Sequence, residues 1–177
     1  MKRRKLKLEE LNRISIKEFQ KTKKIPLVVV LDNVRSQNNI GSVFRTSDAF
    51  LVEEIILCGI TATPPNTEIH KTALGAEDSV NWRYFEDTLV ALETLKSEGY
   101  IVYSIEQAEN SQLLDSIQLD KEKKYAVILG HEVHGVMQEA INLSDGCIEI
   151  PQYGTKHSLN VSVTAGIIIW DFFKQLH

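Results

Sequence analysis

Short apolar runs alternate with segments of helical periodicity along most of the chain. Five runs are short and rich in β-branched residues, as expected for strands that are covered on both faces. These runs are PLVVVLD (26–32), EEIILCG (53–59), YIVYSIE (100–106), YAVILG (125–130) and GCIEIP (146–151). Apolar positions at helical spacing predict helices at 38–50, 87–98, about 136–143 and 160–175, and 8–22 is predicted to be a polar helix. Residues 60–82, which contain Pro64-Pro65-Asn66, are predicted to be irregular. The alternation predicts an α/β fold with a mostly parallel sheet flanked by helices on both faces.

Length and composition favour one globular domain. The 177 residues suffice for a full core, and the hydrophobic content of 43% and charged content of 25% are ordinary. No apolar run reaches the roughly 18 residues of a membrane span, and the basic N-terminus lacks the apolar segment of a secretory signal. The two cysteines, Cys58 and Cys147, are too few for a disulfide framework. We therefore expect a cytoplasmic protein without a membrane span.

Charge is distributed unevenly along the chain. Residues 1–24 contain ten Lys or Arg and three Glu and carry +7, whereas residues 25–177 carry −11. We therefore divide the chain into a basic N-terminal arm, 1–24, and a domain, 25–177. A basic arm before an acidic body suggests a tail that binds a polyanion. A solvated first helix that maintains solubility explains the same charges, and composition alone leaves both interpretations open.

Ligands of parallel sheets bind beyond the carboxyl ends of the strands, so the residues that follow each strand are informative. After the first strand comes DNVRSQNNIGSVFRT, where Asn38 or Asn39 can cap the next helix. Gly41 removes a side chain from the first turn, which leaves room for a ligand, and Arg45 lies one turn further on the same face. Free N–H groups and a guanidinium together suit a phosphate. A capped helix with one surface arginine is the alternative.

After the fourth strand, Gly130 and Gly135 bracket a tight loop that contains Glu132. Glycines at these positions permit positive φ and a close approach of backbone to a ligand, and a plain turn is the alternative. His131 and His134 flank Glu132, but the zinc motif HExxH needs histidines four residues apart on a helix, and these are three apart. We therefore expect no metal.

After the fifth strand comes IPQYGTKHSLNVSVTAG, in which Pro151 ends the strand and Gly154 loosens a loop. Ser158 and Asn160 precede a helix that is apolar nearly all round, so we expect the helix and its start to be buried. One capping residue satisfies a helix, whereas two polar residues separated by Leu159 exceed that need. The surplus indicates a functional site.

The motifs of several common enzyme classes are missing from the sequence. There is no GxxxxGK[ST], no GxGxxG and no GxSxG. Assignments as a P-loop ATPase, a dinucleotide-binding enzyme or an α/β-hydrolase therefore have no support.

Taken together, three segments resemble the SPOUT superfamily of RNA methyltransferases, specifically its SpoU (TrmH-like) 2′-O-ribose branch. Asn39-x-Gly41-x-x-x-Arg45 resembles the first motif of that family, and Leu129-Gly130-x-Glu132-x-x-Gly135 resembles the second. Ile150-Pro151 followed by Ser158-Leu159-Asn160-Val161-Ser162-Val163 resembles the third. KTALGAE (71–77) and IEQAENS (105–111) are similar to less specific segments. Each motif alone is weak, but all three occur in order, and the resemblance runs from about residue 27 to 173.

The resemblance implies a C-terminal trefoil knot, a homodimer, and S-adenosylmethionine bound in the knot. It also implies methylation of a ribose 2′-hydroxyl in tRNA or rRNA. The cofactor residues implied are Glu106, Leu129, Gly130, Ile150, Pro151, Ser158 and Leu159. Many relatives carry additional RNA-binding parts, whereas only about 25 residues precede the core here. The particular RNA therefore stays open.

The same resemblance implies catalytic roles for five residues, namely Asn39, Arg45, Glu132, Ser158 and Asn160. Arginine is a poor base because its pKa exceeds about 12, so we expect Arg45 to orient a substrate phosphate and stabilise the developing alkoxide. Asn39 would hold Arg45 or the adjoining subunit. Glu132 and Asn160 would hold the loops and the ribose, and Ser158 would contact the cofactor or the nucleophile.

Two alternatives come from other functional classes. A catalytically silent RNA-binding module would use the same scaffold, although all three motifs contain the expected residue types. A small flavodoxin-like enzyme would bind phosphate through the helix from Asn39 to Arg45, but it has no need for Ser158 and Asn160. Binding of S-adenosylmethionine distinguishes both from a methyltransferase.

Overall fold

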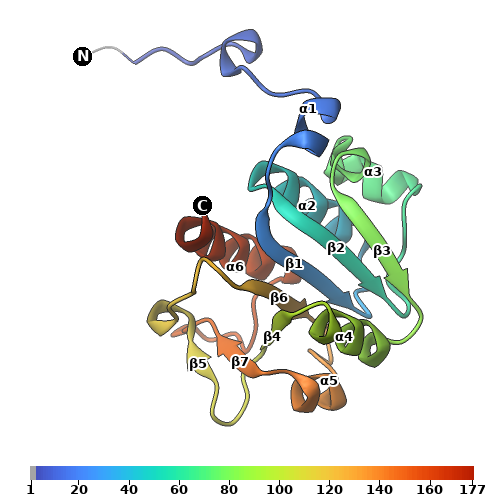
Figure 1. Cartoon of the computed structure of the whole chain (residues 1–177), viewed down its shortest axis with the longest axis vertical. Coiled ribbons are helices and arrows are strands. Elements are labelled where there is room, and N and C mark those ends of the chain that lie inside the picture. Colours follow the sequence, from blue (N-terminus) through green and yellow to red (C-terminus); the bar gives the residue numbers. More distant parts are fainter. Residues whose placement is uncertain (1–2) are drawn as a thin grey trace.

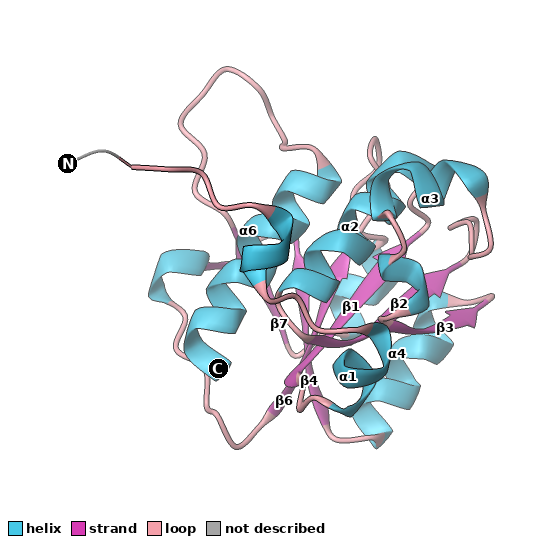
Figure 2. Ribbon diagram, turned by 90° about the horizontal axis from the view of Figure 1, so that it is seen from above, coloured by secondary structure: helices cyan, strands magenta, loops and turns pink. Residues whose placement is uncertain are grey.

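The computed structural model describes residues 3–177, which form a seven-stranded sheet with helices on both faces (Figures 1 and 2). The strands are β1 (Ile25–Asp32), β2 (Val52–Cys58), β3 (Asn81–Phe85), β4 (Tyr100–Ile105), β5 (Gln112–Leu113), β6 (Lys124–Leu129) and β7 (Gly146–Glu149). Their spatial order is β3-β2-β1-β6-β4-β7-β5, and every neighbouring pair is parallel. The predicted parallel α/β sheet is therefore confirmed.

Helices cover the sheet in two layers. The α-helices are α1 (Ile16–Lys21), α2 (Gln37–Ala49), α3 (Thr67–Ala73), α4 (Thr88–Ser97), α5 (Gln138–Leu143) and α6 (Val161–Leu176), and short 3-10 turns lie at η1 (Leu8–Leu11), η2 (Ala76–Asp78) and η3 (Leu114–Ser116). Alternate residues of β1 point to opposite faces. Leu27, Val29 and Leu31 pack in the core with α2 and α6, whereas Val28 and Val30 pack in the core with α4 and α5. All five are fully buried, which explains why β1 is continuously apolar.

The prediction of an irregular segment at 60–82 was wrong, because this segment contains α3 and the start of β3. Asn66 caps α3, and its side chain accepts hydrogen bonds from Glu68 N (2.9 Å) and Ile69 N (3.2 Å). The seven residues of α3 are too few to show a helical period. β3 is an edge strand with exposed and half-buried residues, so it lacks the apolar run that marks the inner strands.

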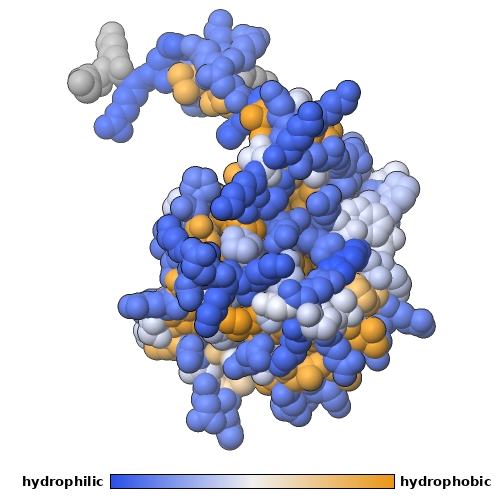
Figure 3. Space-filling model, in the orientation of Figure 1, coloured by the Kyte–Doolittle hydropathy of each residue, from blue (hydrophilic) through white to orange (hydrophobic). Residues whose placement is uncertain are grey.

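The predicted helix at 8–22 was also wrong in part, because two short helical pieces replace it. Asn12, with φ 48°, ends η1, and Ser15 caps α1 by accepting a hydrogen bond from Glu18 N at 3.3 Å. The segment extends away from the sheet (Figure 1), and its surface is mostly hydrophilic (Figure 3). Phe19 is buried in the core and attaches α1 to the body of the molecule. No helix within residues 3–177 has the length and apolar character needed to cross a membrane.

The final helix is less buried than its sequence predicts. Ala165, Ile168 and Phe172 are fully buried, but the opposite side of α6 is open. Val163, Ile167 and Trp170 are 51%, 36% and 48% exposed, and residues 153–160 before the helix are exposed as well. The expectation of a buried helix start was therefore wrong for a single chain. An apolar stripe at this spacing requires a covering surface that one chain does not supply.

The order of strands brings distant loops together. β6 lies between β1 and β4, and β7 lies on the far side of β4. After β7 the chain returns across the sheet, and α6 packs against α2 and β1. Because all strands are parallel, the loops that follow β1, β4, β6 and β7 lie at the same edge of the sheet.

Candidate functional site

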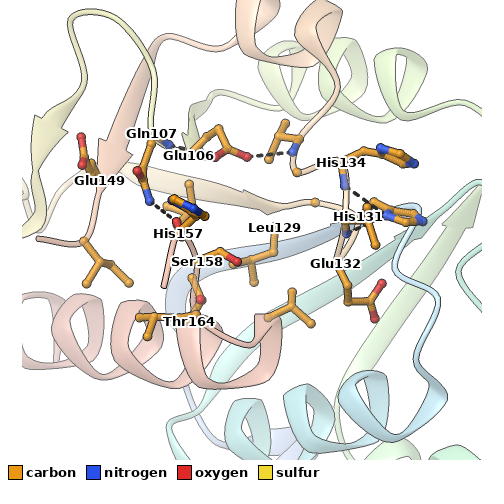
Figure 4. A pocket seen from close by; sticks show the side chains of 18 of the residues that line it. Glu106, Gln107, Leu129, His131, Glu132, His134, Glu149, His157, Ser158 and Thr164 are labelled. Carbon is orange, nitrogen blue, oxygen red and sulfur yellow. Dashed lines mark hydrogen bonds between the residues drawn. The ribbon is translucent and has the colours of Figure 1, made fainter. Parts of the chain in front are cut away.

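A pocket of about 710 Å³ lies at the carboxyl ends of β4, β6 and β7, beside the start of α6 (Figure 4). Of the predicted cofactor and catalytic residues, eight line it: Glu106, Leu129, Gly130, Glu132, Ile150, Ser158, Leu159 and Asn160. Pro151 is not part of the lining, although Ile150 and Gln152 on either side of it are. The second and third motifs therefore meet in one cavity.

Glu132 connects the loop after β6 to the start of α2 through hydrogen bonds. Its carboxylate accepts hydrogen bonds from Arg35 N at 3.0 Å and Ser36 N at 2.9 Å. It also accepts one from Asn39 Nδ2 at 3.2 Å. Glu132 is exposed, but partial desolvation of its carboxylate alone would raise its pKa. The hydrogen bonds from these backbone N–H groups and from Asn39 outweigh that effect, so the pKa lies below its ordinary value. Glu132 is therefore held as a carboxylate that joins the first motif to the second.

Asn39 and Asn160 extend this connection to the third motif. Asn160 Nδ2 donates to Asn39 Oδ1 at 3.2 Å, so Asn39 lies between Glu132 and Asn160. Asn160 is at the same time the N-cap of α6, and its Oδ1 accepts from Ser162 N at 2.9 Å and from Val163 N at 3.4 Å. One asparagine thus caps the helix and joins the network. Ser158 is free of the capping task and faces the pocket (Figure 4).

Close contacts within the protein explain both glycines of the second motif, with backbone at Gly130 and with the Glu106 side chain at Gly135. A Cβ on Gly130 would lie 2.2 Å from the carbonyl carbon of Gly135, and one on Gly135 would lie 2.1 Å from Glu106 Oε2. Gly135 also has φ 68°, as the sequence predicted. Glu106 accepts hydrogen bonds from Gln107 N (2.9 Å) and Val136 N (3.0 Å). The close approach that we expected of a ligand is made instead by the protein itself.

His131 and His134 lie side by side in the pocket lining, with ring centroids 4.7 Å apart and ring planes tilted by 30°. His131 Nδ1 accepts hydrogen bonds from Val133 N at 3.0 Å and His134 N at 3.3 Å. This nitrogen therefore has a structural task within the tight loop, and the loop is closed further by backbone hydrogen bonds between His131 and Gly135.

The first motif differs from its predicted arrangement in three ways. Ser36, rather than Asn38 or Asn39, caps α2, accepting from Asn39 N at 3.3 Å. Gly41 does not leave room for a ligand, because a Cβ there would lie 2.2 Å from Ile69 O of α3. Arg45 is exposed and is not among the residues that line the pocket. Within one chain, the structure therefore does not bring Arg45 to the cavity.

Gln107 in the pocket lining, and the buried Asp32 outside that lining, were not predicted. Gln107 Nε2 donates to His157 O at 2.8 Å and joins the loops after β4 and β7 (Figure 4). Asp32, buried at the end of β1, accepts hydrogen bonds from Thr88 Oγ1 at 2.6 Å and from Met137 N at 3.2 Å. Asp32 ends the first apolar run, and a buried carboxylate at a strand end is the one signal that would have identified it.

Comparison with known proteins identifies the class to which this site belongs. The sequence profile of the SpoU rRNA methylase family matches residues 26–170. The chain therefore belongs to this family, as the three motifs indicated.

Particular relatives act on two kinds of RNA. The chain is 34% identical over 166 residues to the tRNA (guanosine(18)-2′-O)-methyltransferase of Thermus thermophilus, covering 94% of this chain and 84% of the relative. It is 34% identical over 149 residues to the 23S rRNA (guanosine-2′-O-)-methyltransferase RlmB of Nitrosomonas europaea, covering 84% of this chain and 56% of that protein.

Solved structures agree with this assignment. The TrmH/SpoU tRNA modifying enzyme of A. aeolicus superposes with a TM-score of 0.79 at 25% identity, covering 90% of this chain and 81% of that one. An AdoMet-bound rRNA methyltransferase of Sinorhizobium meliloti superposes with a TM-score of 0.80 at 25% identity, covering 90% and 60% of the two chains.

Proposed function

We infer that this protein transfers the methyl group of S-adenosylmethionine to a ribose 2′-hydroxyl of tRNA or rRNA. The observation that carries the conclusion is the chain of hydrogen bonds Glu132–Asn39–Asn160, which joins all three family motifs at one pocket. Its relatives of known specificity, named above, methylate ribose hydroxyls in both tRNA and rRNA.

The pocket suits S-adenosylmethionine in size and charge. Its volume of about 710 Å³ falls in the range of small-molecule sites. Three carboxylates, Glu106, Glu132 and Glu149, line it, and no Lys or Arg is found among its described lining residues. The resulting negative potential favours the positively charged sulfonium. We propose as cofactor contacts the residues implied by the family, namely Glu106, Leu129, Gly130, Ile150, Pro151, Ser158 and Leu159.

The cofactor, when bound, supplies a methyl group already activated by positively charged sulfur. The residues of the chain must then align the ribose oxygen with the methyl carbon and the sulfur, so that a C–O bond forms as the C–S bond breaks and S-adenosylhomocysteine leaves. The hydroxyl proton passes to a phosphate oxygen of the substrate. In our proposal Ser158 faces the reacting groups from the pocket wall, and Asn160 positions the ribose. Glu132 and Asn39 act by holding the loop of residues 130–135 against α2.

Arg45 enters this scheme through a second copy of the chain. We propose a homodimer formed through the open stripe of α6, Val163, Ile167 and Trp170, whose exposure in one chain is 36–51%. α2, which carries the exposed Arg45, packs beside α6. In the dimer, Arg45 of one copy reaches the pocket of the other, where its guanidinium orients a substrate phosphate and stabilises the alkoxide.

Two further parts of the proposal concern chain organisation. We propose that the segment after β7 is threaded as a trefoil knot, which the return of α6 across the sheet and the likeness to TrmH/SpoU structures support. We also propose that residues 1–24 form a basic arm that attracts RNA phosphates to the domain of residues 25–177. Because tRNA and rRNA are its proposed substrates, we also propose that the enzyme acts in the cytoplasm.

The decisive experiment combines cofactor binding with product analysis. Purified protein is titrated with S-adenosylmethionine by calorimetry and is incubated with tRNA and rRNA, whose nucleosides are then analysed by mass spectrometry. We expect cofactor binding and one new 2′-O-methylated nucleoside, and we expect loss of product with Ser158→Ala. RNA binding without cofactor binding would instead identify a catalytically silent module.

A further inference from the structure

A second cavity lies at the edge of the sheet, away from the cofactor pocket. It has a volume of about 610 Å³ and lies between α3 and the edge strand β3. Pro64, Pro65 and Trp82 line it with flat, largely apolar side chains, and His70, Glu77 and Asp78 are its ionisable groups. Flat apolar walls with a few polar groups at their margin are the usual features of a pocket for a planar ring.

Trp82 is part of a larger aromatic surface. In the pairing of β3 with β2, Trp82 lies beside Ile55 and Tyr84 lies beside Leu57, so both aromatic residues point to the same face. Trp82 is half-buried, and Tyr84 is 47% exposed with its hydroxyl donating to Gly59 O at 2.9 Å. Residues two apart on a strand are separated by about 6.6 Å. The two rings therefore form a row along an exposed sheet edge.

The carboxylates of this cavity are not equivalent. Glu77 is fully engaged, because Oε1 lies 2.5 Å from His70 Nδ1 and Oε2 accepts from Gly75 N at 3.0 Å. Asp78 is exposed, and its carboxylate makes no hydrogen bond or ion pair to the described residues 3–177. An unengaged carboxylate beside an aromatic wall can accept hydrogen bonds from ring N–H and amino groups. Guanine presents two such donors side by side on its Watson–Crick edge.

We propose that this cavity binds an unpaired guanine of the RNA substrate, stacked on Trp82 and hydrogen-bonded to Asp78, with Tyr84 supporting the neighbouring base. Single-stranded bases are recognised in this way, by aromatic stacking and by hydrogen bonds to their Watson–Crick edge. β3 and β6 are three strand positions apart, about 14 Å, which corresponds to about four stacked nucleotides. The proposal rests on the RNA substrate inferred above and adds a second contact to it.

Trp82→Ala tests this site in the full-length protein. We expect affinity for an RNA hexamer with one guanine among uridines to fall about tenfold, as for the loss of one stacked base. The KM for RNA should rise, whereas kcat and the KM for S-adenosylmethionine should stay unchanged. The dependence of affinity on salt should also stay the same, because no phosphate contact is lost. Trp82→Phe should retain most of the affinity, and Asn81→Ala, on the other face of β3, serves as the control.

Asp78→Asn provides a second test that leaves the aromatic wall in place. This variant should bind the guanine-containing hexamer no better than an all-uridine hexamer, whereas the parent protein prefers the former. Unchanged affinity in both variants would overturn the proposal. A change in oligomeric state for Trp82→Ala would overturn the proposal too, because it would show that this surface forms a contact between protein copies. If the protein prefers the guanine-containing hexamer but transfers no methyl group to RNA, only the function inferred above is refuted.

Discussion

Replacement of Glu132 by Gln tests whether the connection between the motifs holds the pocket loop of residues 130–135 in place. Glu132 receives three hydrogen bonds, from Arg35 N, Ser36 N and Asn39 Nδ2. A Gln side chain keeps one acceptor oxygen and turns an NH₂ group toward at least one of these donors. Because Glu132 is exposed, the loss lies at the lower end for a hydrogen bond to a charged group, about 1 kcal/mol.

This magnitude sets two measurable effects. For a protein of this size, 1 kcal/mol lowers Tm by about 2–4 °C. The same loss, transferred to the loop of residues 130–135 that lines the pocket, weakens S-adenosylmethionine binding about fivefold. Differential scanning fluorimetry and calorimetry measure these values, and Glu93→Gln, at an exposed carboxylate of α4 away from the pocket, is the matched control. If Glu132→Gln has the same Tm and the same cofactor Kd as the parent protein, the proposed role of Glu132 is refuted.

The pH dependence follows from the same contacts. The pKa of Glu132 is lowered in the folded protein, so its contribution to stability is complete above the ordinary value of about 4.3. The contribution is lost as pH falls below that value and through the lowered pKa. We expect the difference in unfolding free energy between the parent protein and Glu132→Gln to shrink in this acidic range, and a difference that is constant with pH would contradict this assignment.

The remaining predictions concern the dimer, the shared site and the arm. Arg45→Ala and Ser158→Ala should each abolish methyl transfer, and the Arg45 variant should still bind the cofactor. If each site combines residues of both copies, an equal mixture of the two variants with exchanging subunits should recover about one quarter of the parent activity. No recovery despite subunit exchange would place both residues in one chain. Trp170→Asp should yield monomers by analytical ultracentrifugation, because it puts a charge in the stripe of α6, and a variant that stays dimeric would exclude this stripe as the interface. Deletion of residues 1–20 should weaken RNA binding and reduce its salt dependence, whereas an unchanged slope would make the arm a solubilising segment.

Sequence patterns predicted the inner part of the fold well and its margins poorly. β1 and β6 are buried on both faces, so nearly all of their residues are apolar and each strand is recognisable as an uninterrupted apolar run. β3 has one neighbour and a mixed environment, and its five residues carried no comparable signal. The arm was predicted as one helix because its polar residues gave no indication of the break at Asn12.

The candidate site shows the same division. The motifs placed Glu132, Asn39 and Asn160 near strand ends, where a parallel sheet gathers its loops. Their hydrogen bonds join residues separated by 93 and 121 positions in the chain, and no local pattern predicts such pairing. Gly41 illustrates the opposite case, because its lack of a side chain suggested a ligand but serves the packing of α3.

By itself, the sequence determined the class of fold and the family, and it supplied the candidate site residues, because burial, turn formation and motif spacing are properties of neighbouring residues. Only the tertiary structure decided which of these residues meet. It separated Arg45 from the pocket of its own chain, left one side of α6 open, and created a second cavity between α3 and β3. These features depend on how elements distant in the chain pack against one another, and packing is a property of the folded chain as a whole.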